Sequence, residues 1–126
     1  MTDPFADIQG VLKTYFDALY SCDIGLLEQI FHSRAVYATA DESPALIRSM
    51  AEYFPVVAKR TSPASQNAPR RDVIESIDLA GANTAMARVR CTINAHDFVD
   101  FLTLIREDGH WRIMSKIFAM RPAQEG

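Results

Sequence analysis

The chain has 126 residues, with 13 basic and 16 acidic side chains and a net charge of −3. This length fits a single domain over 1–126, and a hydrophobic fraction of 48% is too high for a disordered chain. The slightly acidic balance excludes nucleic acid as the main partner, because that kind of binding depends on a basic field.

Two helices are expected at the start of the chain. Pro4 suits a first turn because proline's missing N–H is not needed there, and the helix should run to about Tyr20. Asp23 is positioned to cap a second, shorter helix. The apolar residues of both segments recur with helical spacing: Ile8, Val11, Leu12, Tyr15, Phe16 and Leu19 in the first, and Leu26, Leu27, Ile30 and Phe31 in the second. Residues 1–3 are expected to be a flexible tail.

The next segment predicts a short strand, a third helix and a loop. Val36 to Ala40 is rich in strand formers, and Ser43-Pro44 resembles a helix start. The apolar stripe of that third helix would contain Leu46, Ile47, Met50, Tyr53 and Phe54. Residues 59–72 have no apolar periodicity and contain four basic residues and two prolines, so a mobile loop is expected there.

The second half of the chain changes to the alternating pattern of strands. Strands are expected near 72–80, 84–94, 97–107 and 110–120, followed by a flexible tail over 121–126. Asp108-Gly109 is a strong two-residue hairpin signal. If Glu107 faces His110, Asp100 lies on an apolar face opposite Ile117, with no cation directly beside it. We therefore expect Asp100 to be held as a neutral acid; Arg90, Arg106 and Lys116 are the first partners to consider if it is instead ionised.

Helices followed by an antiparallel sheet indicate an α+β fold. The stretch Tyr15-Phe16-Asp17-Ala18-Leu19-Tyr20-Ser21-Cys22-Asp23, with Phe31-His32-Ser33-Arg34-Ala35, resembles the opening of nuclear transport factor 2-like proteins. The segment from Phe98 to Leu104, with Asp108-Gly109-His110-Trp111-Arg112-Ile113 and Lys116-Ile117-Phe118, is similar to the end of their putative lumazine-binding subgroup. The resemblance implies three helices packed on a strongly curved, mainly antiparallel sheet that forms a cone with an internal pocket.

The resemblance also implies roles for particular residues. Tyr15 and Asp100 match the two proton-donating positions of a steroid isomerase of this superfamily, where such a pair binds a developing enolate oxygen. Thr39 stands where that enzyme has its proton-abstracting carboxylate, and a threonine cannot act as that base. His32 is a third candidate for acid/base chemistry.

The predicted pocket lining follows from the resemblance and from the register of the strands. It comprises Tyr15, Tyr37, Thr39, Tyr53, Phe54, Cys91, Phe98, Asp100, Leu102, Ser115 and Ile117. A homodimer is expected through the outer sheet face, which in this register contains Phe101, Met114, Lys116, Phe118 and Met120.

Three functions remain open at this point. The first is a protein that binds a small hydrophobic or aromatic carbonyl compound without chemistry of its own. The second is an acid/base enzyme, an isomerase, dehydratase or cyclase using Tyr15 and Asp100. The third is a non-catalytic interaction module. Two scattered cysteines, three separated histidines and the lack of glycine-rich phosphate loops imply no disulfide, metal or cofactor. No apolar run is long enough for a membrane span, so a cytoplasmic protein without membrane contact is expected.

Overall fold

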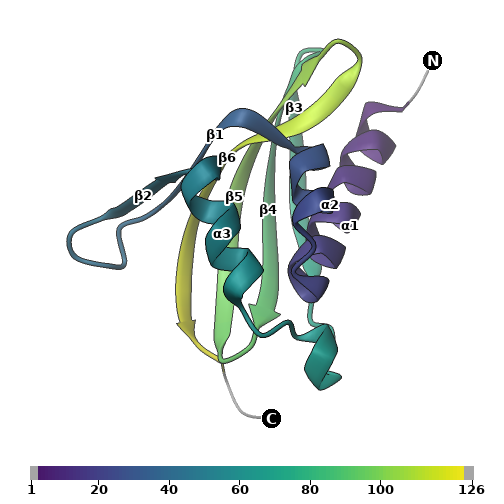
Figure 1. Ribbon diagram of the computed structural model, residues 1–126. Helices are drawn as coiled ribbons and strands as arrows, with labels where there is room; N and C mark the ends of the chain where they lie inside the picture. Colours follow the sequence, from purple (N-terminus) through teal and green to yellow (C-terminus); the bar gives the residue numbers. More distant parts are fainter. Residues whose placement is uncertain (1–2, 124–126) are drawn as a thin grey trace.

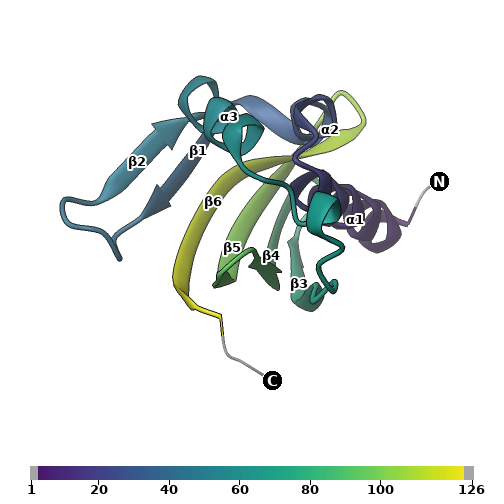
Figure 2. The same ribbon diagram turned by 60° about the horizontal axis from the view of Figure 1, so that its bottom comes forward.

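The computed structural model describes residues 3–123, which form three helices packed on one side of a six-stranded sheet. In chain order the elements are α1 (Pro4–Ser21), α2 (Ile24–Ile30), β1 (Phe31–Thr39), β2 (Leu46–Ser49), α3 (Met50–Lys59), η1 (Ala64–Gln66), β3 (Val73–Ala80), β4 (Thr84–Ile93), β5 (His96–Glu107) and β6 (His110–Pro122). The strand order is β2-β1-β6-β5-β4-β3. The strands curl around the helices, as Figures 1 and 2 show, and the α+β fold predicted from the sequence is confirmed.

The first two helices begin where their capping residues predict. The Asp3 side chain accepts a hydrogen bond from the Phe5 amide at 3.0 Å, and the Asp23 side chain accepts one from the Leu26 amide at 3.2 Å. Each cap satisfies an amide that has no partner within its helix. The buried face of α1 then packs into the curve of the sheet and brings Tyr15 into the interior of the cone.

The prediction that the third helix starts at Ser43-Pro44 was wrong. Residues 46–49 form β2, which pairs antiparallel with β1, and the helix begins only at Met50. Ser49 and Glu52 form a capping box, in which each side chain accepts from the backbone amide of the other. This reciprocal cap starts α3 one turn later than the apolar pattern alone suggests, and it leaves Ile47 two-thirds exposed on the sheet.

The segment over residues 59–72 lies against α1. The Tyr20 hydroxyl donates to the Ala68 carbonyl at 2.6 Å, and Arg70 pairs with Asp17 of α1 at 3.0 Å. The Arg70 guanidinium also lies 4.6 Å from the centre of the Tyr20 ring. The segment is therefore tied to α1 near its end, while the mobility expected for it stays a prediction.

Strands β3 to β6 agree closely with the sequence prediction, but β6 contains a bulge that the sequence analysis missed. Glu107 faces His110 as predicted, and this register continues to the pair Leu104–Ile113. The next pair is Thr103–Ser115, so β6 has one extra residue at Met114. Because side chains alternate between the two faces of a strand, one extra residue exchanges the faces of everything that follows it.

The bulge moves five of the predicted residues to the opposite face of β6: Ser115, Lys116, Ile117, Phe118 and Met120. Lys116 and Phe118, expected on the outer face, are buried inside the cone with 3% and 6% of their surfaces exposed. Ser115 and Ile117, expected in the pocket, lie on the outer face, where the Ser115 hydroxyl is 2.6 Å from the Thr103 hydroxyl. Ile117 is 45% exposed. The register predicted for the second half of β6 was therefore wrong.

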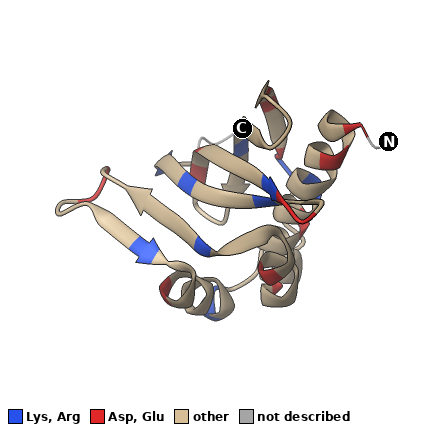
Figure 3. Ribbon diagram, turned by 90° about the horizontal axis from the view of Figure 1, so that it is seen from above, with Lys and Arg blue, Asp and Glu red and all other residues tan. Residues whose placement is uncertain are grey.

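The outer face of the sheet carries a row of apolar side chains from neighbouring strands. Ala38 of β1 pairs with Ile47 of β2 and with Ile117 of β6, and Ile117 pairs in turn with Phe101 of β5. Phe101 is 49% exposed, close to the exposure of Ile117. The hairpin of β1 and β2 extends beyond the helices, with acidic side chains at its turn (Figure 3).

Candidate functional site

Four polar side chains from four different elements meet inside the cone. Tyr15 comes from α1, Tyr53 from α3, Asp100 from β5 and Lys116 from β6. Tyr15, Tyr53 and Asp100 are completely buried, and Lys116 is nearly so. Burying charged groups is costly unless they pair with one another, so the contacts among these four residues decide what the site can do.

Asp100 is the centre of these contacts. The Tyr15 hydroxyl donates to Asp100 Oδ2 at 2.6 Å, and Lys116 Nζ lies 3.9 Å from the same oxygen. The Lys116 ammonium also donates to the Tyr53 hydroxyl at 3.3 Å. Asp100 Oδ1 is buried and has no hydrogen-bond partner among the described residues. The polar groups of the cluster thus mostly contact one another, but Asp100 Oδ1 remains available to accept a hydrogen bond.

Aromatic rings surround the Lys116 ammonium. Five ring centres lie 5.2 to 5.6 Å from Nζ, those of Tyr15, Tyr37, Tyr53, Phe98 and Phe118. A ring face is attracted to a cation by its quadrupole, and this attraction is stronger where water is absent. Tyr37 and Tyr53 are stacked with their centres 4.2 Å apart, which keeps this wall compact. The rings therefore replace part of the hydration that the buried ammonium has lost.

The pKa values of the cluster follow from burial and from Asp100. Burial alone would lower the pKa of Lys116, but the Asp100 carboxylate, together with Tyr53, Cys91 and Tyr37, outweighs this effect and holds the pKa above its ordinary value. Burial raises the pKa of the Tyr15 phenol well above its ordinary value, and the neighbouring negative charge of Asp100 adds to the increase. At neutral pH, Lys116 is therefore charged and Tyr15 is a neutral hydrogen-bond donor.

This geometry corrects the role expected for Asp100. The sequence analysis placed no cation beside it and expected a neutral acid that donates to a ligand carbonyl. Lys116, one of the three alternative partners considered, is in fact that cation, and Tyr15 donates to Asp100. Because the Tyr15 hydroxyl is the donor in this contact, Asp100 is an acceptor. The paired donors of a steroid isomerase are therefore not reproduced.

Thr39, which stands at the position expected for a proton-abstracting base, has a structural role in this chain. Thr39 is almost fully buried, and its hydroxyl accepts from the Asp41 amide at 3.1 Å. The Asp41 carboxylate accepts from the Met120 amide at 3.3 Å and so engages the end of β6. Glu42 lies at the mouth of the cone. The nearby carboxylates do not join Tyr15 and Asp100 in the interior.

The cone opens through a mouth of about 280 Å³ between β1, β2, the end of α3 and the β4–β5 turn. Its lining includes Tyr37, Phe98 and Phe118, the same rings that face Lys116 from the other side. Arg48 and Arg60 contribute the positive charges of the mouth. An aromatic wall thus separates a partly basic mouth from the buried ion pair.

The structure brings most of the predicted lining together and separates the rest. Tyr15, Tyr53 and Asp100 meet in the interior, Tyr37, Thr39 and Phe98 line the mouth, and Cys91 and Leu102 are buried on the inner face of the sheet. Burial raises the pKa of the Cys91 thiol to about 12, so it stays protonated. Met120, expected on the outer face, also lines the mouth.

His32 and Phe54 belong to a different hollow, of about 490 Å³, at the other end of α3. His32 Nδ1 accepts from the Arg34 amide at 3.0 Å, and Nε2 lies 3.5 Å from the Glu107 carboxylate. Neither Tyr15 nor Asp100 lines this hollow. His32 is therefore not placed to exchange a proton with the interior cluster.

Lys116 and Phe118 were expected on the outer face, with Lys116 named only as an alternative partner of Asp100, and Arg48 and Arg60 were not expected at the site. The sequence of β6 gives no clear signal for the first two, because Ile117 and Phe118 are both large and apolar and alternation does not decide which of them faces inward. The arginines have no signal either, since their places depend on how β2 and α3 meet the sheet.

Among residues 3–123 no group of three or more His, Cys, Asp or Glu side chains is arranged to hold a metal ion. No helix within the same residues is long and apolar enough to cross a membrane.

Comparison with known proteins gives family and fold matches. A family model described as "Putative lumazine-binding" matches residues 3–119. The chain is similar to an NTF2-like protein of unknown function from Silicibacter pomeroyi, at 27% identity and a TM-score of 0.82, over 96% of this chain and 100% of that chain. An NTF2-like protein of unknown function from Shewanella baltica is 24% identical with a TM-score of 0.84, over 95% of each chain. The CaMKII hub of S. rosetta is similar in fold, at 9% identity and a TM-score of 0.73, over 96% and 99% of the two chains. No match was found among curated proteins.

Proposed function

Because the chain belongs to the family described as putative lumazine-binding and has an NTF2-like fold, we propose that it binds a small molecule in the mouth of its cone. The observation that carries this proposal is the open Oδ1 of Asp100, whose other oxygen lies 3.9 Å from a buried cation behind an aromatic wall. A buried polar atom without a partner costs free energy, and a ligand that supplies the missing hydrogen bond recovers it.

The ligand is proposed to be a flat aromatic compound with a lactam edge. Tyr37, Phe98 and Phe118 offer ring surfaces on which a planar molecule packs. An N–H of the ligand would donate to Asp100 Oδ1, and an adjacent carbonyl oxygen would accept from the Lys116 ammonium. A lactam presents these two groups side by side. The edge reaches the ion pair only when rings of the wall move aside, so the mouth must widen on binding.

Binding is proposed ahead of catalysis because the interior groups are occupied with one another. Tyr15 donates to Asp100, and Lys116 is held charged between Asp100 and Tyr53. Acid/base catalysis needs a second titratable group that acts as base in the same cavity. The residue at the position expected for that base is Thr39, which is engaged with the backbone of Asp41.

Calorimetric titration with lumazine, which has a lactam edge, tests this proposal against 1,3-dimethyllumazine, in which the imide N–H is replaced. We expect lumazine to bind about tenfold more tightly, since a site built to accept a hydrogen bond rejects an analogue without the donor. Tyr37→Ala should weaken binding, whereas Tyr20→Phe, on the outer side of α1, should not. Equal affinity for both compounds would contradict the lactam assignment, and no binding of either at millimolar concentration would contradict the proposed ligand class.

A homodimer through the outer sheet face is the second part of the proposal. The apolar row defined by Ile47, Ala38, Ile117 and Phe101 replaces the residue set expected from the sequence, because Lys116 and Phe118 are buried inside. A two-fold axis would bury this row against its own copy. Light scattering should give twice the chain mass, and Phe101→Glu with Ile117→Glu should give a folded monomer. A monomeric native protein at micromolar concentration would contradict this part alone.

A further inference from the structure

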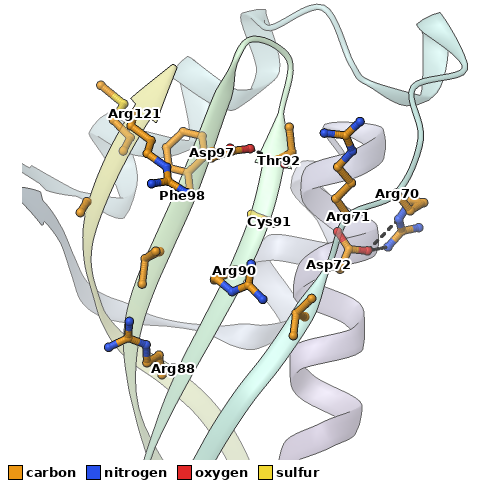
Figure 4. A pocket seen from close by; sticks show the side chains of 14 residues that line it. Arg70, Arg71, Asp72, Arg88, Arg90, Cys91, Thr92, Asp97, Phe98 and Arg121 are labelled. Carbon is orange, nitrogen blue, oxygen red and sulfur yellow. Dashed lines mark hydrogen bonds and ion pairs between the residues drawn. The ribbon is translucent and has the colours of Figure 1, made fainter. Parts of the chain in front are cut away.

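A third hollow, of about 880 Å³, lies along the outer side of β3 to β6 and shares Phe98 and Met120 with the mouth of the cone. Five arginines line it: Arg70, Arg71, Arg88, Arg90 and Arg121. Figure 4 shows that they come from the segment before β3, from β4 and from the end of β6, so residues distant in sequence surround the same space. The chain as a whole has a net charge of −3, and this concentration of positive charge is therefore local.

The lining of this hollow contains two carboxylates, those of Asp72 and Asp97, against five arginines. Asp72 pairs with Arg70, with nitrogen–oxygen distances of 2.6 and 2.8 Å, and Arg70 is further neutralised by Asp17. Arg88 and Arg90 share a single carboxylate, that of Glu75, at 3.0 and 3.2 Å.

Arg71 makes no ion pair within residues 3–123. Arg88 and Arg90 contact Glu75 through Nε, so further donors of both guanidinium groups remain, and their side chains are half exposed. A guanidinium group is a planar fork of N–H donors that matches the oxygens of phosphate and carboxylate groups. The hollow thus combines an excess of positive charge with unused donors from β4 and from the segment before β3.

The space between these arginines is also partly apolar. Val73, Val99 and Ala119 line it together with Phe98. A volume of this size falls within the usual range for small-molecule sites and exceeds what one inorganic anion fills. The lining therefore suits an organic molecule that carries more than one anionic group.

We propose that this outer hollow binds a polyanionic small molecule, whose phosphate or carboxylate groups are held by Arg71, Arg88 and Arg90. The body of the ligand packs on Val99 and Ala119, next to the apolar row proposed for dimerisation. This inference concerns the outer face of the sheet, whereas the lactam site lies in the mouth of the cone, and the two hollows have Phe98 and Met120 in common.

Calorimetric titrations of the full chain with tripolyphosphate, citrate and a nucleoside triphosphate test the proposal. The first two probes separate phosphate from carboxylate recognition, and the third adds an organic body. Binding of at least one probe, weakened by added salt, supports the inference. Absence of binding of all three at millimolar concentration would overturn it. A single-stranded oligonucleotide that binds more tightly than every small probe would also overturn it.

Arg71→Gln is the decisive variant, because this side chain is without an ion pair and its loss should leave the fold intact. We expect its affinity for the binding probe to fall about tenfold, the scale of one lost charged hydrogen bond. Arg106→Gln is the matched control, since it removes the same charge from an exposed position outside the hollow. An equal loss in both variants would show that the probe senses only overall charge and would contradict a built site.

Discussion

Lys116 Nζ lies 3.9 Å from Asp100 Oδ2 inside the cone, and neither side chain exposes more than 3% of its surface. The two residues come from adjacent strands and sit diagonally across the ladder, since Asp100 pairs with Phe118 and Lys116 pairs with Leu102. A buried ion pair of this kind contributes little net stability compared with apolar residues, yet breaking one half of it is costly. A substitution that removes only one of these two charges should therefore destabilise the protein.

Removing Lys116 alone should strongly destabilise the protein. Lys116→Met leaves the Asp100 carboxylate buried without a counter-ion, and we expect the free energy of unfolding to fall by about 3–5 kcal/mol. Adding Asp100→Asn to this variant should recover most of the loss, because it removes the uncompensated charge. Urea denaturation of both variants at pH 7 measures the two effects. A single variant as stable as the native protein would contradict the buried pair.

Stability should decrease as the pH rises above about 9. Burial raises the pKa of Cys91 from 9.0 to about 12, so between these values the folded state holds a proton that the unfolded state has lost. The stabilising contribution is complete below pH 9 and falls by roughly 1.4 kcal/mol per pH unit above it. Tyr15 and Lys116 act in the same direction at higher pH, because both of their pKa values are raised in the folded state.

The matched variant for this pH dependence is Cys91→Ala. Removing the thiol should delay the onset of the decrease to about pH 10, where Tyr15 begins to contribute. Denaturant midpoints compared between pH 8 and 11 give the two onsets. The same onset in the native protein and the variant would rule out Cys91 as its cause.

The bulge at Met114 predicts that truncating two neighbouring residues costs very different amounts of stability. Phe118→Ala removes a ring that is 6% exposed and packs on Tyr37 and Phe98, so a loss of about 3–5 kcal/mol is expected. Ile117→Ala truncates a side chain that is 45% exposed and should cost roughly 1 kcal/mol or less in the monomer. Thermal unfolding of the two variants compares them directly. If Ile117→Ala were the less stable of the two variants, the result would contradict the bulge and support the register predicted from the sequence.

The capping box of α3 gives a smaller, local prediction. Ser49→Ala removes the acceptor for the Glu52 amide and should lower the free energy of unfolding by about 1 kcal/mol. Ser33→Ala, at an exposed position of β1, is a suitable control. Chemical denaturation resolves a difference of this size, and equal stability of the two variants would show that the cap is not energetically important.

Local features of the sequence were sufficient to predict several elements. Asp3 and Asp23 mark two helix starts because a cap depends on residues only two or three positions away. The turn at Asp108-Gly109 places both residues at positive φ, as the sequence of that hairpin requires. The resemblance in the first helix and in β5 also identified Tyr15 and Asp100 as neighbours, and they are hydrogen-bonded in the fold.

The remaining part of the site depended on tertiary structure. One extra residue at Met114 inverted the second half of β6, and alternation read along a single strand does not contain the pairing that creates such a bulge. That inversion brought Lys116 to Asp100 and so changed the expected neutral donor into a paired acceptor. The sequence by itself therefore determined the fold and two partners of the interior cluster. The charge of the cluster was decided only when the curved sheet brought β6 against β5.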